Sequence, residues 1–346
     1  MRHFDYTELK NRTWDNRVVG YLSLIHEYKG KQSAFMKQRS EEMERLVEIA
    51  KVQSTEASNS IEGIRTTETR LRQLMLERTT PRNRSEKEIA GYRDALNIVH
   101  ENFAYIPLTS NYILQLHKVL LSHTDFGFGG SFKSVQNYIS ATDGLGNQFT
   151  LFTPPAPYET PEAVEEICRE YNRAIGEGKV DPLLIIPVFI HDFLCIHPFL
   201  DGNGRMSRLL TTLLLYRAGY EVGKYISLEA KIAKNKDAYY AALEDSQHGW
   251  HLRQDDPAPF VTYLLSVILA AYRDFDDRME IISPDSYRTV KNAVESKLGK
   301  FTKKEILELC PGLSASTVER HLKRLTAEGH LAKHGAGKST FYTRTQ

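Results

Sequence analysis

The segment 197–208 carries the residue types best suited to chemistry, because it combines a histidine, a carboxylate and two arginines with two glycines. Apolar runs at 183–194 and 209–215 predict a helix on each side, so the segment is expected to be a loop that opens the second helix. The start of a helix offers free backbone N–H groups and the positive end of the helix dipole, which together bind anions. The arrangement therefore predicts a phosphate-binding site.

The glycines and arginines of this segment match that chemistry. Gly202 and Gly204 flank Asn203, and glycine permits both a positive φ and a close approach of the backbone to a ligand. Arg205 and Arg208 lie three residues apart, so both project from one helix face, as a clamp on phosphates requires.

Two further side chains indicate how a bound phosphate ester would react. Asp201 offers oxygen ligands suited to Mg²⁺, and His197 can act as a base near neutral pH. Taken alone, a His-Pro pair usually marks a loop and an Asp-Gly pair a turn. We favour the functional interpretation because both pairs occur here together with the glycines and the arginines.

The segment resembles, without a gap, the signature of the Fic family, His-Pro-Phe-x-(Asp/Glu)-Gly-Asn-Gly-Arg-x-x-Arg. Most members of this family transfer AMP from ATP to a protein hydroxyl. The resemblance extends over roughly residues 1–285 and implies a mainly α fold, in which a helical core carries a β-hairpin flap.

The resemblance also implies a role for each residue of the segment. His197 takes the proton from an incoming Ser, Thr or Tyr hydroxyl, and Asp201 holds Mg²⁺ against the phosphates of ATP. The segment 202–204 holds the α-phosphate, Arg205 the β-phosphate and Arg208 the γ-phosphate. The implied substrate and cofactor are therefore ATP and Mg²⁺.

Composition indicates the class of protein. The chain has 346 residues, a net charge of +1 and 26% charged residues, so composition alone implies no polyanionic partner. Its three cysteines lie far apart without metal-ligand spacing, and we interpret them as reduced packing residues. The chain begins without a signal-peptide pattern, and no stretch reaches 18 uninterrupted apolar residues. We expect a cytoplasmic protein that does not contact membranes.

Hydrophobic periodicity predicts a mostly helical chain with three parts. These are an N-terminal helical region (1–104) with an inhibitory helix near 54–63, a catalytic core (105–285) and a C-terminal module (286–346). Helices are predicted at 31–52, 67–78, 84–103, 112–122, 160–176, 181–196, 205–218, 236–247 and 257–282.

The stretch 130–155 is expected to form a β-hairpin, because it alternates in polarity around a turn at 143–147 and ends in two prolines. On composition alone, a surface excursion would be the favoured interpretation. The family resemblance implies a flap that pairs with a target segment by strand addition. It places four flap residues beside the nucleotide and the target: Asn137, Tyr138, Ile139 and Ser140.

A pair of tyrosines marks the expected nucleoside side of the site. Tyr239 and Tyr240 lie on a predicted amphipathic helix, and core packing is the alternative explanation for them. A tyrosine offers a flat apolar face with a terminal hydroxyl, which suits a nucleoside. The resemblance implies that both face the adenine and ribose and that Gln247 completes that side.

The segment from Ser58 to Gly63 resembles the inhibitory motif of the same family, (Ser/Thr)-x-x-x-Glu-(Gly/Asn). Ser58 and Glu62 are four residues apart and share a helix face, and Gly63 suits the end of a helix. The resemblance implies that Glu62 reaches Arg208 and blocks the competent pose of ATP. An ordinary helix end on the surface is the alternative.

The last 60 residues differ from the rest in charge, with 12 Lys and Arg against 5 Asp and Glu. Two predicted helices about a turn (301–307 and 313–325) precede a pair of short strands joined at 335–338. The pattern resembles a winged helix-turn-helix, a module that binds DNA or protein. DNA binding through 286–346 and a homodimer remain open alternatives.

Two classes of function compete on these observations. The first is a protein adenylyltransferase autoinhibited by Glu62, whose target is a protein hydroxyl, its own included. The second is a DNA-binding regulator whose helical body senses a nucleotide. The complete motif favours the enzyme, because a sensor needs phosphate contacts but no base. Within the enzyme class, removal of AMP or transfer of another phosphate-bearing group remains open.

Overall fold

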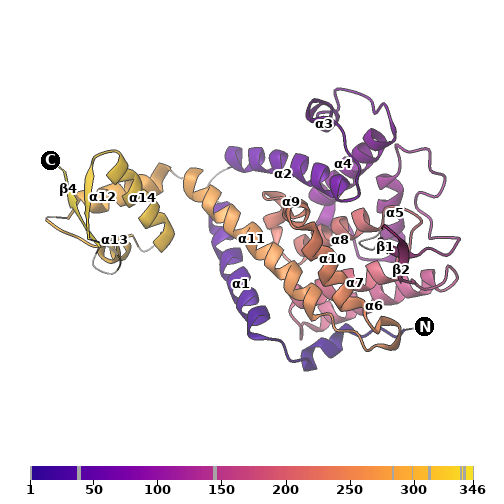
Figure 1. Ribbon diagram of the computed structural model, residues 1–346. Coiled ribbons are helices and arrows are strands. Elements are labelled where there is room, and N and C mark those ends of the chain that lie inside the picture. The colour runs from indigo at the N-terminus through magenta and orange to yellow at the C-terminus, as the bar shows by residue number, and fades with distance from the viewer. Residues whose placement is uncertain are drawn as a thin grey trace. The chain divides into compact units, whose positions relative to one another are not determined.

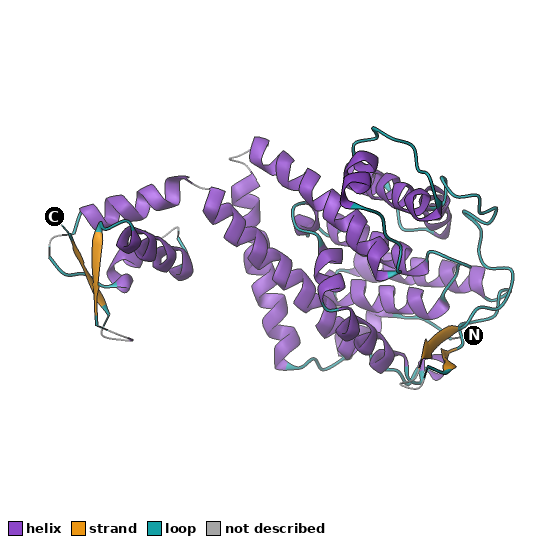
Figure 2. Cartoon of the chain, turned by 45° about the horizontal axis from the view of Figure 1, so that its top comes forward, coloured by secondary structure: helices purple, strands orange, loops and turns teal. Residues whose placement is uncertain are grey.

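The structure, a computed structural model, describes residues 2–36, 40–142, 146–282, 284–297, 299–310, 313–335, 337 and 340–345. These residues are predominantly helical (Figure 2), so the predicted mainly α fold is confirmed. The chain divides into two compact units, Met1–Phe275 and Asp276–Gln346.

The helices of the first unit follow one another along the chain, with the β-hairpin between α5 and α6 (Figure 1). They are η1 (Tyr6–Asn11), α1 (Asn16–Met36), α2 (Ser40–Ile61), α3 (Glu68–Met75), α4 (Arg84–Asn102), η2 (Phe103–Tyr105), α5 (Ser110–Leu120), α6 (Thr160–Glu177), α7 (Pro182–Ile196), α8 (Asn203–Arg217), η3 (Glu221–Lys224), α9 (Leu228–Lys234), α10 (Lys236–Gln247), η4 (Trp250–Leu252) and α11 (Ala258–Ile282).

The helix predicted at 31–52 is helical in the residues that the structure describes. Residues 31–36 belong to α1 and residues 40–52 to α2, and residues 37–39 lie outside the described residues. α2 then continues to Ile61, so the second part of the predicted helix and the inhibitory segment form one element.

The core of the first unit is built on α7, which packs against α6 and α8. α7 is apolar nearly all round, so it must be covered on every side. Asp181 caps its N-terminus by accepting a hydrogen bond from the N–H of Leu183. Phe189 and Phe193 are fully buried, and burying one such side chain contributes about 1.5–3 kcal/mol.

The turn between α7 and α8 has two residues in the left-handed region of φ. His197 ends α7 with φ 49°, and Gly202 precedes α8 with φ 86°. A Cβ at Gly202 would also lie 3.2 Å from the side chain of Leu120, so this position requires glycine. These two residues turn the chain so that the loop and the first turn of α8 lie around one region.

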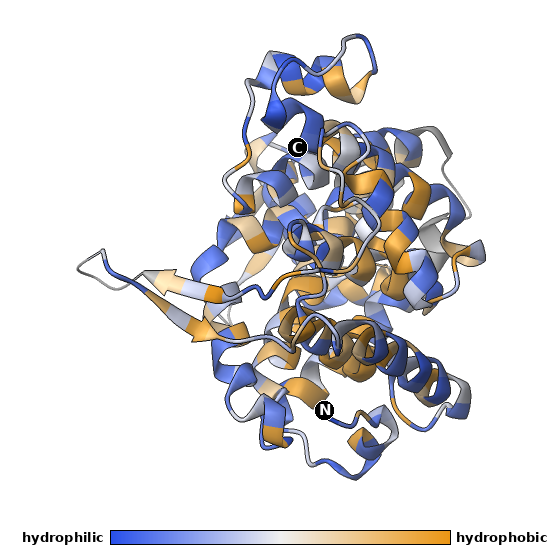
Figure 3. Ribbon diagram, turned by 90° about the vertical axis from the view of Figure 1, so that its right-hand side faces the viewer, coloured by the Kyte–Doolittle hydropathy of each residue, from blue (hydrophilic) through white to orange (hydrophobic). Residues whose placement is uncertain are grey.

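The predicted hairpin is present as β1 (Ile139–Thr142) and β2 (Gln148–Phe152), which are antiparallel with Ser140 opposite Thr150. Figure 3 shows it projecting from the helical body. Residues 143–145 of the predicted turn lie outside the described residues. The hairpin borders the loop that follows α7, since Asn137, just before β1, bonds the backbone of that loop.

The second unit contains α12 (Pro284–Glu295), α13 (Lys303–Leu309), α14 (Ala315–Ala327), β3 (Leu331–His334) and β4 (Phe341–Arg344). β3 and β4 pair antiparallel, and α13 begins with a capping box between Thr302 and Glu305. Its core includes Val290, Phe301 and Leu322. Residues 336 and 338 of the predicted turn lie outside the described residues.

Within α11, the stretch Ala258–Met279 is long and apolar enough to cross a membrane by length and composition. However, 56% of its apolar window is buried inside the structure, as in a core helix. Phe260, Leu264 and Ile268 are among its buried side chains. The burial of this face accounts for its composition.

Candidate active site

A cavity of about 500 Å³ opens at the turn between α7 and α8. It brings together the predicted motif, Glu62, part of the flap and the tyrosine pair. Its lining comprises Glu62, Ile139, Ser140, Ala141, Leu151, His191, Leu194, Cys195, His197, Leu200, Asp201, Gly202, Asn203, Gly204, Arg205, Arg208, Tyr239, Tyr240, Leu243, Glu244 and Gln247.

The first turn of α8 faces this cavity with its backbone exposed to a ligand. Gly202 at the N-cap supplies no side-chain hydrogen bond to the helix. A Cβ at Gly204 would lie 2.3 Å from Oε1 of Glu62, so the Glu62 carboxylate lies directly over the backbone there. A carboxylate over a helix N-terminus is the arrangement expected of an anion site.

His197 is held as a neutral base. Its Nδ1 lies 3.2 Å from the carbonyl oxygen of Leu194, and since a carbonyl can only accept, Nδ1 carries the proton. Burial lowers the pKa of His197 to about 4, and the nearby charge of Lys133 adds to the effect. The ring is therefore uncharged near pH 7, and Nε2 is the nitrogen that can take a proton.

Lys133 and Asn137 fix the loop that carries His197. The Nζ of Lys133 donates to Oδ1 of Asn137 (2.9 Å) and to the carbonyl oxygen of Ile196 (3.0 Å). Nδ2 of Asn137 in turn donates to the carbonyl oxygens of His197 and Phe199, both at 3.0 Å. Burial lowers the pKa of Lys133 to about 8. Asn137 thus supports the loop from behind and does not line the cavity.

Asn203 also ties the loop together. Its Oδ1 accepts from the N–H of Phe199 (2.9 Å), and its Nδ2 donates to the carbonyl oxygen of the same residue (2.7 Å). The ring of Phe199 stacks on His117, whose Nε2 lies 3.0 Å from the carbonyl oxygen of Asp201. The side chain of Asn203 therefore orders the loop, and the backbone of the 202–204 turn faces the cavity.

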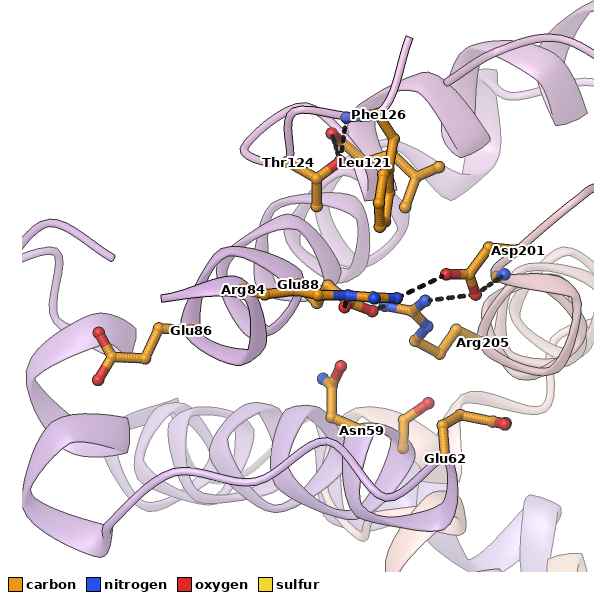
Figure 4. A network of polar contacts seen from close by, with 12 residues as sticks. Asn59, Glu62, Arg84, Glu86, Glu88, Leu121, Thr124, Phe126, Asp201 and Arg205 are labelled. Carbon is orange, nitrogen blue, oxygen red and sulfur yellow. Dashed lines mark hydrogen bonds and ion pairs between the residues drawn. The ribbon is translucent and has the colours of Figure 1, made fainter. Parts of the chain in front are cut away.

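Arg205 is buried in a network of alternating charges (Figure 4). Its Nη1 lies 2.7 Å from Oε2 of Glu88 on α4, and its Nη2 lies 3.1 Å from Oδ1 of Asp201. Arg84 lies one turn before Glu88 and donates from Nε to Oε1 of Glu88 (2.9 Å). Nη2 of Arg84 lies 3.5 Å from Oδ2 of Asp201, which closes the ring.

Arg208 is held by the end of α2. Its Nη2 donates to Oε1 of Glu62 (2.7 Å) and to the carbonyl oxygen of Ser58 (2.9 Å), and its Nε donates to Oγ of Ser58 (2.7 Å). The predicted contact between Glu62 and Arg208 is thus present. Nη1 of Arg208 is buried and has no hydrogen-bond partner among the described residues.

The end of α2 is fixed from two sides. α2 ends at Ile61, and Gly63 adopts a left-handed conformation with φ 78°, which prevents the helix from continuing past Glu62. Lys236 on α10 donates from Nζ to the carbonyl oxygen of Ile61 (2.6 Å). Ser58 and Gly63 do not line the cavity and act on it through Arg208 and the position of Glu62.

Part of the cavity lining is aromatic. Tyr239 is buried, Tyr240 is 42% exposed, and their rings meet edge-on at 5.3 Å between centroids. Both line the cavity together with Gln247 and with Ile139 and Ser140 of the flap. Tyr138 is 58% exposed and lies outside the lining. The cavity therefore combines aromatic side chains with the helix start and the two arginines.

Asp201 offers a carboxylate to a divalent cation. Its Oδ1 accepts from the N–H of Gly202 at 2.6 Å, and the side chain is 34% exposed. Mg²⁺ in nucleotide sites is usually held by one or two carboxylates together with phosphate oxygens. Asp201 beside the N-terminus of α8 fits this pattern.

A second group of possible metal ligands is His191, Asp192 and Asp255, whose ligand atoms lie within 4.8 Å of one another. Arg2 forms ion pairs with both carboxylates, and Trp250 donates from Nε1 to Oδ1 of Asp192 (2.7 Å). Burial raises the pKa of Asp192 to about 6. The guanidinium of Arg2 already contacts both carboxylates, so the cluster fixes the N-terminal segment to the core.

Sequence patterns did not identify Glu88, Arg84 or His117 as part of the site. Glu88 is a buried carboxylate on a predicted helix, and an acidic residue on the buried face of a helix is the signal that could have marked it. Its partner Arg205 lies 117 residues away in the sequence, so spacing alone gives no link.

Comparison with known proteins is consistent with this site. Residues 107–215 match the Fic/DOC family. The chain is 31% identical over 118 residues to a Fido domain-containing protein of Dictyostelium discoideum, covering 32% of this chain and 82% of that protein. It is 30% identical over 178 residues to Protein adenylyltransferase Fic of Drosophila yakuba. The match spans 51% of this chain but only 31% of that relative.

Solved structures share the fold. A Fic family protein from Desulfovibrio desulfuricans aligns with a TM-score of 0.63 at 20% identity, covering 96% of this chain and 97% of that one. Fic-1 from C. elegans aligns with a TM-score of 0.60 at 21% identity, covering 77% of this chain and 74% of that one. At these identities the likeness concerns the fold alone.

Proposed function

Because this chain belongs to the Fic/DOC family, we propose that it is a protein adenylyltransferase that moves AMP from ATP to a protein hydroxyl. The observation that carries the proposal is the placement of a neutral His197 in one cavity with the N-terminus of α8 and two arginines. A binding protein would need the phosphate contacts but no base beside them.

The proposed reaction is a displacement at the α-phosphate of ATP. Nε2 of His197 takes the proton of an incoming Ser, Thr or Tyr hydroxyl while its oxygen attacks the phosphorus and pyrophosphate leaves in line. The backbone N–H groups at the start of α8 hold the α-phosphate, and Arg205 and Arg208 hold the β- and γ-phosphates. Positioning and electrostatic stabilisation account for most of the rate in this kind of transfer.

Asp201 is the residue that would hold Mg²⁺, which when bound neutralises charge on the phosphates. The tyrosine pair receives the nucleoside, because Tyr239 and Tyr240 offer apolar ring faces in the cavity. Gln247 adds hydrogen-bonding groups at that end of the cavity.

We further propose that Glu62 inhibits the enzyme. While Arg208 is bound to Glu62 and Ser58, it cannot also hold the γ-phosphate, and the carboxylate over Gly204 repels a phosphate there. ATP then binds in a pose unsuited to in-line attack. Ser58 contributes to the same inhibition, because its Oγ and its carbonyl oxygen accept two further hydrogen bonds from the guanidinium.

The flap supports a protein target. Ile139 and Ser140 of β1 line the cavity, and β1 pairs with β2 on one side. An extended segment of a target could add to this small sheet through its backbone, which tolerates varied sequences. The chain's own exposed hydroxyls are candidate acceptors.

The order of elements in the second unit supports a winged helix-turn-helix, with α14 as its second motif helix. DNA binding by this unit remains a secondary proposal, because two basic residues of α14 are already paired: Lys323 with Glu319 and Arg324 with Glu328. Binding to DNA would fall steeply with salt. Absence of a gel shift at low salt would favour a protein partner.

Three buried free cysteines agree with the cytoplasmic location we propose.

Labelled ATP tests the reaction type. Incubation with ATP labelled at the α-phosphate should label protein in a lysate, whereas label at the γ-phosphate should not be retained. Retention of the γ-label would indicate kinase chemistry. Loss of α-label from prelabelled protein, with no gain, would indicate removal of AMP instead.

A further inference from the structure

The two oxygens of the Asp201 carboxylate have different surroundings. Oδ1 is occupied, because it accepts from the N–H of Gly202 (2.6 Å) and lies 3.1 Å from Nη2 of Arg205. Within the part of the chain that the structure describes, Oδ2 contacts only Nη2 of Arg84, at 3.5 Å (Figure 4). Oδ2 is therefore the oxygen that remains for a cation.

The two arginines beside Asp201 also differ in freedom. The side chain of Arg205 is 1% exposed and is paired with Glu88, so it cannot leave without breaking a buried ion pair. The side chain of Arg84 is 69% exposed, and its guanidinium lies over the ring of Phe126, 4.9 Å from the centroid. The exposed Nη2 end of Arg84 can therefore move away from Asp201, whereas Arg205 is part of the fixed structure.

We propose that Arg84 competes with the divalent cation for Oδ2 of Asp201 and so sets the metal concentration at which the nucleotide site fills. This inference rests on the proposed function, which gives Asp201 the metal. An ion bound to Oδ2 at the usual 2.0–2.1 Å would lie less than about 6 Å from Nη2 of Arg84, where like charges repel. Arg84 therefore leaves Oδ2 when the cation arrives.

The anchoring of Arg84 suits this role. Its Nε is held by Glu88, the same carboxylate that holds Arg205, so Glu88 keeps the guanidinium within reach of Asp201. When the cation displaces Nη2 of Arg84 from Asp201, the hydrogen bond from Nε of Arg84 to Glu88 can remain. Arg84 is thus a positioning residue that occupies Oδ2 of Asp201 until metal and nucleotide bind.

Binding of Mn²⁺ tests the inference without measuring transfer. Free Mn²⁺ is followed by electron paramagnetic resonance during titration of full-length protein carrying Glu62→Gly, so that Arg208 is free in every protein compared. α,β-Methylene ATP is present, because its α–β bridge cannot be cleaved. Arg84→Gln should lower the Mn²⁺ concentration for half-saturation by about three- to tenfold, as expected for release of an exposed ion pair.

Arg82→Gln is the matched control, because it removes the same charge from an exposed position two residues before Arg84. The contact between Arg82 and Glu86 is made by its backbone N–H and survives the substitution. This control should leave Mn²⁺ binding unchanged. An equal gain in both variants would mean a general charge effect and would overturn the inference.

The remaining outcomes separate this inference from the proposed function. If Asp201→Asn abolishes Mn²⁺ binding but Arg84→Gln leaves it unchanged, the metal role of Asp201 stands and competition by Arg84 is wrong. Weaker binding by Arg84→Gln would make Arg84 a ligand of the phosphates, which also overturns the inference. If Asp201→Asn binds Mn²⁺ normally, or no variant binds it, the metal role itself fails together with the inference.

Discussion

Oε1 of Glu62 lies 2.7 Å from Nη2 of Arg208 and occupies the position above Gly204 that a side chain there would fill. One carboxylate thus acts on two parts of the candidate phosphate site. It pairs with the arginine and covers the backbone at the start of α8. Any treatment that removes this carboxylate should change both the charge and the space available to a nucleotide.

Glu62→Gly should raise self-modification at least tenfold. The substitution frees Arg208 for the γ-phosphate, and each ~1.4 kcal/mol by which the pair disfavours the competent pose corresponds to about tenfold in its population. Glu62→Asp should raise it less, because the shorter carboxylate still opposes phosphate binding. Incorporation of α-label by equal amounts of each protein measures the effect. Unchanged or reduced labelling in Glu62→Gly would rule out inhibition by Glu62.

His197→Ala in the Glu62→Gly protein should reduce transfer of the α-label by at least about 100-fold, since general base catalysis contributes 10²–10⁴-fold. Binding of ATP should remain within about threefold, because the imidazole is assigned to the acceptor hydroxyl and not to the nucleotide. Transfer assays and calorimetric titration with ATP separate the two effects. Near-normal transfer would show that another group removes the proton.

The rate of transfer should not fall as the pH is lowered through 6.5, the ordinary pKa of histidine. Burial lowers the pKa of His197 to about 4, so the base is neutral and active throughout pH 6–8 and is lost only as the pH falls toward 4. Glu62 raises this pKa, so its removal lowers the pKa further and leaves the plateau intact. Measuring kcat/KM of the Glu62→Gly protein from pH 5 to 8 tests this, and a fall centred near 6.5 would contradict it.

Glu88→Gln should weaken ATP binding by about three- to tenfold in the Glu62→Gly background. It removes the charge that holds Arg205, whose guanidinium is then free to shift toward Asp201. It should also lower the free energy of unfolding by a few kcal/mol, because Arg205 is left buried without this partner.

Glu86→Gln provides the control for Glu88→Gln. Glu86 lies on the same helix and is also buried, but it pairs with Arg70 away from the cavity. Its pKa is lowered to about 2, chiefly by the hydrogen bond from Arg70. Glu86→Gln should therefore destabilise the fold while leaving the KM for ATP unchanged. An equal loss of ATP binding in both variants would assign the effect of Glu88 to stability alone.

The flap shows how well a resemblance in sequence predicts the positions of single side chains. Four consecutive residues, Asn137 to Ser140, were expected beside the nucleotide. Ile139 and Ser140 line the cavity, but Asn137 bonds the loop from behind and Tyr138 faces outward. Successive side chains in an extended segment point to opposite sides, and the pairing register shifts between Ile139 and Ser140. Which side chains face the cavity depends on how the hairpin packs against the helical body.

The sequence by itself determined the features that depend on local spacing. Residues 197–208 indicated a helix start with two arginines on one face, and Ser58 and Glu62 indicated one face of a helix that ends at Gly63. Periods of 3.6 and 2 residues follow from backbone geometry, so the helices and the hairpin could be predicted from short windows.

Only the tertiary structure decided which distant groups meet. Arg205 pairs with Glu88 and Arg208 with Ser58, across 117 and 150 residues respectively, because α4 and the end of α2 pack beside α8. Spacing along the chain carries no information about such pairs. Their partners are fixed by the burial of apolar helix faces, and the buried charges then require ion pairs wherever that packing brings them together.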